Sequence, residues 1–244
     1  MNKTLIATAV VGLLSLSSAN AATVVGFKIG ADYWLADTTN SFNDDDNVGH
    51  SFSDDSSQGS VWIAVEHPLP FVPNLKIREN RLESSADLDN VDFTFNGNAF
   101  EGEVSVINEL NNTDFVLYYE ILDNDLVSVD LGAAYKKMNG SLRVFDAGHP
   151  EQIDIDSGVF MGYANAQVGV AGLGLFGFAD VLFGVDESNV YDYGVGLGWQ
   201  FDNLAVNTLV RVGYRDFNFD VSDFSDVSQN TQFKGAFAGV ELRF

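Results

Sequence analysis

The fold is decided by residues 191–201, whose sequence is YDYGVGLGWQF. Aromatic or apolar side chains occupy every odd position of this segment, whereas the even positions carry Asp, Gly or Gln. Successive side chains of a β-strand point to opposite faces, while an α-helix would place its apolar residues three or four apart. The segment therefore predicts a strand with one apolar face and one polar or glycine face.

Strands of this kind recur along the chain. The alternation predicts ten of them, at residues 23–36, 57–68, 73–84, 112–122, 126–137, 156–170, 173–185, 189–201, 204–217 and 231–244. Eight or twelve strands remain possible, because residues 92–95 and 101–106 would form either a hairpin above the membrane or two further strands. Asn139-Gly140 is a tight-turn dipeptide that would close a similar small extension beyond the rim.

The apolar faces of these strands are expected to contact lipid. A soluble sandwich or lipocalin-type barrel would also alternate, but its polar face would carry a solvated mixture of Lys, Glu and Thr rather than glycine and paired charges. Short turns alternate with long acidic loops, expected at about 36–57, 85–111, 138–155 and 218–230. If the strands run alternately up and down, aromatic residues form two belts, with Tyr33, Tyr135, Tyr191, Tyr193 and Tyr214 near one rim and Phe27, Tyr119, Trp199, Phe201 and Phe244 near the other. These features predict an all-β, transmembrane antiparallel β-barrel.

A membrane-spanning helix over residues 158–179 is the competing interpretation, since that stretch carries no formal charge. Asn165 and Gln167 stand two residues apart, however, on one face of an alternating pattern that continues after Gly172. A hairpin that turns near Gly172 explains both halves of the stretch, whereas a helix does not.

The first residues have the pattern of a secretory signal peptide. Lys3 precedes a short apolar run from Leu5 to Leu16, and Ala19-Asn20-Ala21 then provides small residues for a signal peptidase. The apolar run is too short to span a bilayer. We therefore expect residues 1–21 to be cleaved, leaving residues 22–244 as one barrel domain.

The composition excludes several kinds of partner and site. The chain has 35 Asp+Glu against 12 Lys+Arg, a net charge of −23 that becomes −24 once Lys3 is removed. Nucleic acid would be repelled by this charge. The absence of Cys excludes disulfides, thiolate metal sites and cysteine nucleophiles. We expect no cofactor.

The polar faces of the predicted strands carry charges of both signs, which would line the barrel lumen. The basic residues are Lys28, Lys76, Arg78, Lys136, Arg211, Arg215 and Arg243, and the acidic ones are Asp32, Glu66, Glu120, Asp130, Asp180, Asp192 and Glu241. Seven charges of each sign predict a neutral interior filled by ion pairs across the lumen. A ring of one sign would instead have indicated a charge-selective pore.

The excess acidic residues fall in the predicted outer loops. Asp44, Asp45, Asp46, Asp54 and Asp55 are candidates for weak binding of Ca²⁺ or Mg²⁺, which would bridge the loops to anionic lipopolysaccharide. The segment does not match a twelve-residue calcium loop, because Val48 stands at the fifth position. A solvated, self-repelling loop surface with no metal site is the alternative.

Catalysis is not expected. Of the three histidines, His50 and His149 fall in predicted loops and His67 lies in a turn at the opposite rim. His50 has Ser51 and Asp54 nearby, but a mobile acidic loop would not hold a base in register with a nucleophile.

The chain ends on alternating apolar residues, Val240, Leu242 and Phe244. After a signal peptide and a series of amphipathic strands, this ending looks like the terminal signal by which the barrel-assembly machinery of Gram-negative bacteria recognises its substrates.

The chain also resembles an uncharacterised family of Gram-negative outer-membrane β-barrel proteins, the one that co-occurs with GlyGly-CTERM sorting systems. The matching stretches are His67-Pro68-Leu69-Pro70 with Pro73-Asn74, Tyr118-Tyr119-Glu120-Ile121-Leu122-Asp123-Asn124, Tyr191-Asp192-Tyr193 and Gly239–Phe244. The resemblance implies location and fold, and it brings no assigned activity.

The sequence thus predicts an outer-membrane barrel with a structural or surface-interaction role, in contact with outer-membrane lipid and lipopolysaccharide. A narrow, porin-like channel for small solutes or ions is the alternative, and an outer-membrane enzyme is a third possibility.

Overall fold

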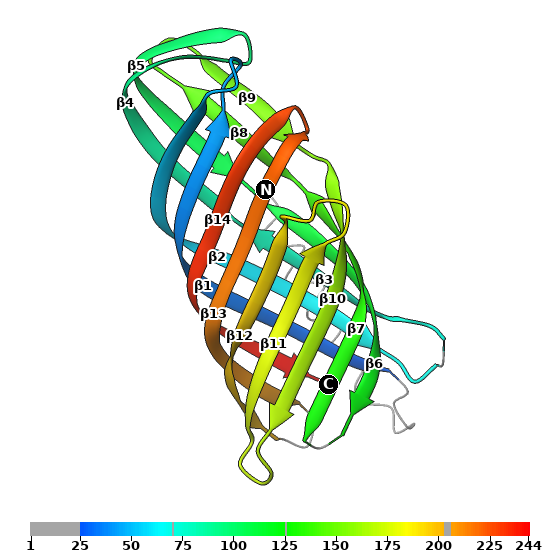
Figure 1. The fold of residues 1–244 in the computed structure, drawn as a ribbon. Coiled ribbons are helices and arrows are strands. Elements are labelled where there is room, and N and C mark those ends of the chain that lie inside the picture. The colour runs from blue at the N-terminus through cyan, green and yellow to red at the C-terminus, as the bar shows by residue number, and fades with distance from the viewer. Residues whose placement is uncertain (1–24, 70, 125, 203–205) are drawn as a thin grey trace, which may run out of the picture.

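The computed structural model describes residues 25–69, 71–124, 126–202 and 206–244, so the predicted signal peptide at 1–21 lies outside the described residues. No helix in these ranges is both long and apolar enough to cross a membrane. The described chain is built from fourteen strands in two sheets, one closed and one open (Figure 1).

Ten strands close into an antiparallel barrel, as the alternation predicted. They are β1 (Gly26–Asn43), β2 (Gly49–Glu66), β3 (Asn74–Arg81), β6 (Asn112–Asp123), β7 (Val127–Met138), β10 (Gly158–Gly169), β11 (Leu175–Gly184), β12 (Tyr191–Phe201), β13 (Asn207–Phe224) and β14 (Val227–Arg243). Their order around the barrel is β1-β14-β13-β12-β11-β10-β7-β6-β3-β2. The first and last strands pair antiparallel along fifteen residue positions and close the ring.

Four strands are longer than expected, and two predicted loops are wrong. Residues 36–57 were expected to form a loop, but β1 and β2 each run for 18 residues through most of this segment and leave only 44–48 as the turn. Residues 218–230 likewise belong mostly to β13 and β14, which turn at 225–226. These segments are rich in Ser, Asp and Asn, so their outward positions have the composition of a loop although the backbone continues to pair.

The other two predicted loops contain a second sheet. It consists of β4 (Glu83–Phe95), β5 (Asn98–Glu109), β8 (Gly140–Phe145) and β9 (Pro150–Ile155), in the order β4-β5-β8-β9. Of the two possibilities for residues 85–110, the hairpin above the barrel is confirmed. Asn139-Gly140 does not close a hairpin, because Asn139 links β7 to β8.

The apolar face changes sides along the long strands. On β13, Val210, Val212 and Tyr214 are exposed on the outside of the barrel, as expected for a surface that meets lipid. Further along the same strand, Phe217 and Phe219 are fully buried and point inward. The apolar side chains of β13 therefore change from its outward face to its inward face between Tyr214 and Phe217.

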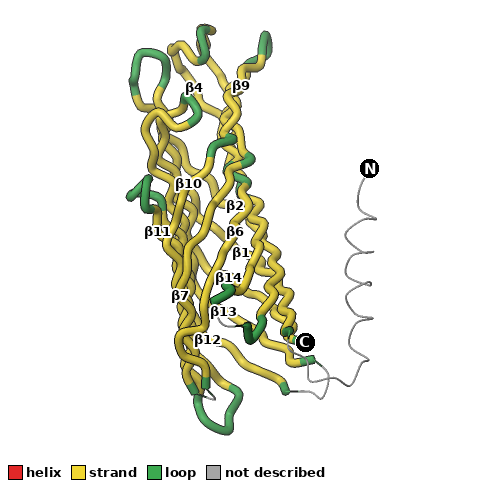
Figure 2. Tube along the Cα trace, turned by 90° about the vertical axis from the view of Figure 1, so that its right-hand side faces the viewer, coloured by secondary structure: helices red, strands yellow, loops and turns green. Residues whose placement is uncertain are grey.

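The reversed segments enclose a core of the kind found in soluble proteins. The inward faces of the long strands and the second sheet pack together, and the largest side chains buried there include Phe42, Phe95, Phe100, Phe217, Phe219, Phe233 and Leu110. The second sheet stands at the end of the barrel away from the C-terminus (Figures 1 and 2). We call this part, formed by the second sheet and the reversed ends of β1, β2, β13 and β14, the outer segment; the opposite end is the short-turn end.

Candidate functional site: the barrel interior

A charged pair spans the barrel from wall to wall. Arg78 lies on β3 and Asp192 on β12, which are five places apart in the ring of ten strands and so face each other across the lumen. The Arg78 guanidinium donates to the Asp192 carboxylate over 2.9 Å. At this level the two walls are joined by a direct contact between side chains.

Asp192 is the centre of a larger ion network. Arg215 donates two hydrogen bonds to it, at 2.8 and 2.7 Å, and the Lys136 ammonium lies 3.5 Å away. Asp114 binds the other side of the cluster, 2.9 Å from Arg78 and 2.7 Å from Lys136. The side chains of Asp114 and Lys136 are completely buried, and that of Asp192 is 2% exposed.

Neutral groups complete the hydrogen bonding of this network. Asn80 accepts a bond from Arg215 at 2.8 Å and donates one to Asp114 at 3.0 Å. Asn112 accepts a bond from Lys136 at 2.9 Å. Buried charges are tolerated only when they are paired and hydrogen-bonded, and this network satisfies both conditions.

The structure places all fourteen predicted lumen charges on the interior side of the wall, and it adds Asp114. Asp123 and Asp202 line the interior cavity as well, so the count becomes seven basic against ten acidic residues, and the predicted neutral interior needs a correction by three charges. Asp114 shares its strand face with Val116 and Tyr118, both of which point inward. The alternation of β6 therefore contained the signal for Asp114, although this residue is not among the fourteen predicted lumen charges.

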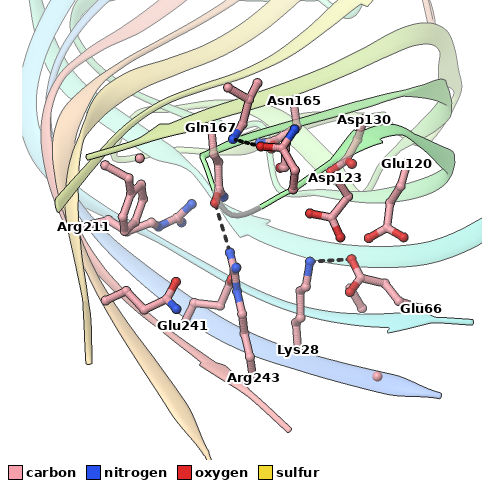
Figure 3. A pocket seen from close by; sticks show the side chains of 18 of the residues that line it. Lys28, Glu66, Glu120, Asp123, Asp130, Asn165, Gln167, Arg211, Glu241 and Arg243 are labelled. Carbon is pink, nitrogen blue, oxygen red and sulfur yellow. Dashed lines mark hydrogen bonds and ion pairs between the residues drawn. The ribbon is translucent and has the colours of Figure 1, made fainter. Parts of the chain in front are cut away.

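Between the ion network and the short-turn end, the barrel contains a cavity of about 730 Å³. Its polar lining includes Lys28, Glu66, Lys76, Glu120, Asp123, Asp130, Asn165, Gln167, Asp180, Arg211, Glu241 and Arg243 (Figure 3). Asp123, Asn124 and Leu126, residues 170–174, and Gln200 and Asp202 line it near the short-turn end. The interior is thus closed by the ion network and hollow on one side of it.

Glycines on the inner wall make room for the aromatic rings that line this cavity. A Cβ atom added at Gly30 would overlap the ring of Trp62, and one added at Gly198 would overlap the ring of Phe176. The rings lie directly on the backbone of the neighbouring strand for this reason. The glycine positions on the polar faces of the strands therefore allow aromatic rings to pack directly against the backbone.

The five outer carboxylates proposed as weak cation ligands do not converge. Asp44 accepts hydrogen bonds from the amides of Asp46 and Val48, at 3.0 and 2.8 Å, and Asp45 accepts from the amides at 96 and 97. Asp54 accepts from the amide of Ser85 at 3.0 Å, and Asp55 is exposed on β2. The described residues contain no group of three or more His, Cys, Asp or Glu side chains placed to hold a metal ion.

Burial opposes the ionisation of Asp44, but its hydrogen bond with His50 and those from the two amides lower its pKa below the usual value. Its carboxylate lies 2.9 Å from His50 Nε2. The role of Asp44 in this geometry is to hold the turn between β1 and β2 together.

Two histidine–aspartate pairs occur in the outer segment. The His50 ring packs 4.4 Å from the Phe93 ring, and the His149 ring is stacked 5.4 Å from Phe100 while its Nδ1 lies 3.1 Å from Asp146. Asp54 bonds to a backbone amide of β4, and the carboxylate that lies against His50 is that of Asp44.

The predicted assembly residues lie on the closing strand. Val240 and Phe244 are exposed on the outer face, and the backbone of Phe244 pairs with that of Phe27, with Phe244 N donating over 2.9 Å. The end of the chain is therefore part of the seam that closes the barrel.

No family model and no curated protein matches the sequence. Among solved structures, the chain is similar to the outer membrane protease OmpT from Escherichia coli, with 10% identity, 93% of this chain and 100% of that chain covered, and a TM-score of 0.50. It is more distantly similar to the translocator domain of autotransporter NalP from Neisseria meningitidis (13% identity, 98% and 95% covered, TM-score 0.43) and to Ail, the attachment invasion locus protein of Yersinia pestis (14%, 90% and 99%, 0.32). At these identities the likeness concerns the fold alone, which is that of an outer-membrane β-barrel.

Proposed function

We propose that this protein is a Gram-negative outer-membrane barrel that does not conduct solutes and that presents a folded, acidic outer segment at the cell surface, in a structural or surface-interaction role. The observation that carries the proposal is the ion network centred on Asp192, which joins opposite walls of the lumen. The apolar belt on the outside of the ten strands supports the location, because such a surface is stable only against lipid.

The outer segment supplies a second seal. The tightly packed core that includes Phe217, Phe219 and Phe233 fills the space enclosed by the long strands above the network. Close-packed protein interiors contain few voids larger than a water molecule. A solute would have to displace both the ion network and this core, which argues against the narrow-channel alternative.

Planar-bilayer recording tests the proposal. We expect no stable conductance steps from the refolded wild type, and none from the double variant Arg78→Ala/Asp192→Ala, because the core of the outer segment remains in place. Heat-modifiable mobility on gels confirms that each preparation is folded. Reproducible steps from folded wild type would overturn the proposal in favour of a channel.

The orientation that we propose places the short-turn end in the periplasm and the outer segment outside. The acidic outer segment would then lie among lipopolysaccharide headgroups, where divalent cations bridge carboxylates and phosphates. Val240, Leu242 and Phe244 would be offered to the assembly machinery before the seam closes. Membership of the uncharacterised family named above remains a prediction.

We also propose that the barrel is not an enzyme. The Asp44 carboxylate already accepts two amide hydrogen bonds, and the His50 ring is packed between Phe42 and Phe93. A base that is held by the core in this way has little freedom to approach a substrate. No lipase or protease activity in the folded wild type would agree with this proposal; activity that His50→Ala abolishes would contradict it.

A further inference from the structure

The cavity at the short-turn end carries a surplus of negative charge on one wall. Each basic residue that lines it already has an acidic partner, in the pairs Lys28–Glu66, Lys76–Asp180, Arg211–Asp32 and Arg243–Glu241. Glu120, Asp123 and Asp130 also line it, but none of them forms an ion pair with a described residue. These three carboxylates belong to the hairpin of β6 and β7 and gather on the same side of the cavity (Figure 3).

Asp130 is the most unusual of the three. It is only 9% exposed, yet its carboxylate forms no hydrogen bond or ion pair within the described part of the chain. Its direct partner across the β6–β7 ladder is Glu120. Like charges at directly opposed positions of an antiparallel pair destabilise the sheet. The cavity therefore contains charge that a bound cation would neutralise.

We propose that this cavity binds a linear organic polyamine. The described carboxylates do not converge as metal ligands, whereas the amines of a polyamine are spread along a flexible chain and can reach acidic groups that lie apart. Trp62, Tyr118 and Tyr163 line the same space, and Lys76 and Arg211 already lie over the rings of Trp62 and Tyr163, so the wall accommodates cationic groups against aromatic rings. The volume of about 730 Å³ is in the range of sites for small molecules.

An anionic ligand fits this cavity less well. The guanidinium of Arg243 is engaged by Glu241 at 2.7 Å and by Gln167 at 3.3 Å, and Arg211 donates to both oxygens of Asp32. An anion would have to compete with these internal partners for each positive charge. A cation meets carboxylates that are not yet neutralised.

The proposal concerns the cavity alone and does not depend on where the protein resides or on whether it conducts. Calorimetric titration of the refolded barrel in a zwitterionic detergent, at low ionic strength, tests it with putrescine, spermidine and spermine. We expect one molecule per barrel, with affinity rising with the number of amines. Asp130→Asn should weaken spermidine binding about tenfold, which is the effect of losing one favourable charge interaction of ordinary strength.

The matched control is Asp55→Asn, which removes an exposed carboxylate from β2 in the outer segment. It should leave the affinity for spermidine unchanged. Asp130→Asn also removes the charge repulsion with Glu120, so we expect the ligand-free variant to unfold at a higher temperature than the wild type. A higher unfolding temperature would show that the variant is folded and that its weaker binding reflects the lost carboxylate.

Three results would overturn the proposal. Spermidine affinity that is unchanged in Asp130→Asn would show that this cavity is not the site. Weakened binding in Asp55→Asn alone would place the cation on the outer carboxylates. Mg²⁺ binding as tight as that of spermidine would show that net charge, rather than an extended amine, is recognised.

Discussion

At the scale of single residues, the carboxylate of Asp192 holds together the ion network inside the barrel. Asp192 serves Arg78, Arg215 and Lys136 together, and its side chain is almost completely buried. A buried ion pair adds little net stability compared with a well-packed apolar pair, but removing one partner leaves the others charged and unsolvated. Removing one charge of the network should therefore lower the stability of the folded barrel.

We predict that Asp192→Asn lowers the free energy of unfolding by about 3–5 kcal/mol, the cost of breaking a buried ion pair from one side. Urea unfolding in detergent micelles, followed by tryptophan fluorescence, measures this change. Asp55→Asn, on the exposed face of β2, should stay within about 0.5 kcal/mol of the wild type. Equal stability of the two variants would mean that the three cations find other partners.

The carboxylate of Asp44 should make the stability of the β1–β2 turn depend on pH. Its folded-state pKa is below its usual value of 3.8, so the stabilisation of the β1–β2 turn is complete above pH 3.8 and is lost as the pH falls through the lower folded value. Protection of the Asp46 and Val48 amides against hydrogen exchange should fall over that acidic window. In Asp44→Asn the protection should be lower and independent of pH over the same range; an unchanged pH dependence in this variant would assign the effect to another group.

At the scale of elements, the long strands combine two environments. The outward face of β13 is apolar up to Tyr214, and its inward face is apolar from Phe217 onward. Since alternate side chains of a strand always lie on opposite faces, a shift by one residue in the apolar pattern moves the buried surface from lipid to a core. One continuous backbone thereby serves the membrane and the outer segment.

The two halves of β13 should respond differently to truncation. Phe219→Ala should cost about 3–5 kcal/mol, as expected for a large aromatic side chain in a close-packed core. Val212→Ala, on the exposed outer face, creates no cavity and should cost less than about 1 kcal/mol. Urea unfolding compares the two, and cleavage by proteinase K should increase in the outer segment of Phe219→Ala alone. Similar costs for both substitutions would contradict the reversed polarity.

At the scale of the whole molecule, the acidic charge is distributed unevenly. The interior holds seven basic and ten acidic side chains, so most of the net charge of −23 lies elsewhere, largely on the outer segment and the outward face of its strands. Such a surface repels anions and other acidic surfaces unless cations screen it. Contacts of the outer segment should therefore depend on salt and on divalent cations.

The orientation of the barrel can be tested because the chain contains no cysteine. A single cysteine in place of Asp89, an exposed residue within β4, should react with a membrane-impermeant maleimide on intact cells. A cysteine at Ala171, in the turn between β10 and β11, should react only after the outer membrane is permeabilised. The reverse pattern would invert the proposed orientation, and equal labelling would argue against insertion in the membrane.

The sequence by itself determined that the chain is built from amphipathic strands, because the alternation of period two is a local property that each strand displays independently. It favoured a barrel of ten strands and left eight or twelve possible. It also indicated which charges face the lumen, from the same alternation. It did not show the extent of the long strands, since polar outward positions at residues 37–43 and 49–57 have the composition of a loop.

Only the tertiary structure decided which charges meet. Arg78 and Asp192 are 114 residues apart in the chain and face each other only because the ring closes with ten members. In the same way, Asp130 is left without a partner by the arrangement of its neighbours around the cavity, not by anything in its own strand. Pairing across a lumen depends on the diameter, register and closure of the whole barrel, which no local pattern encodes.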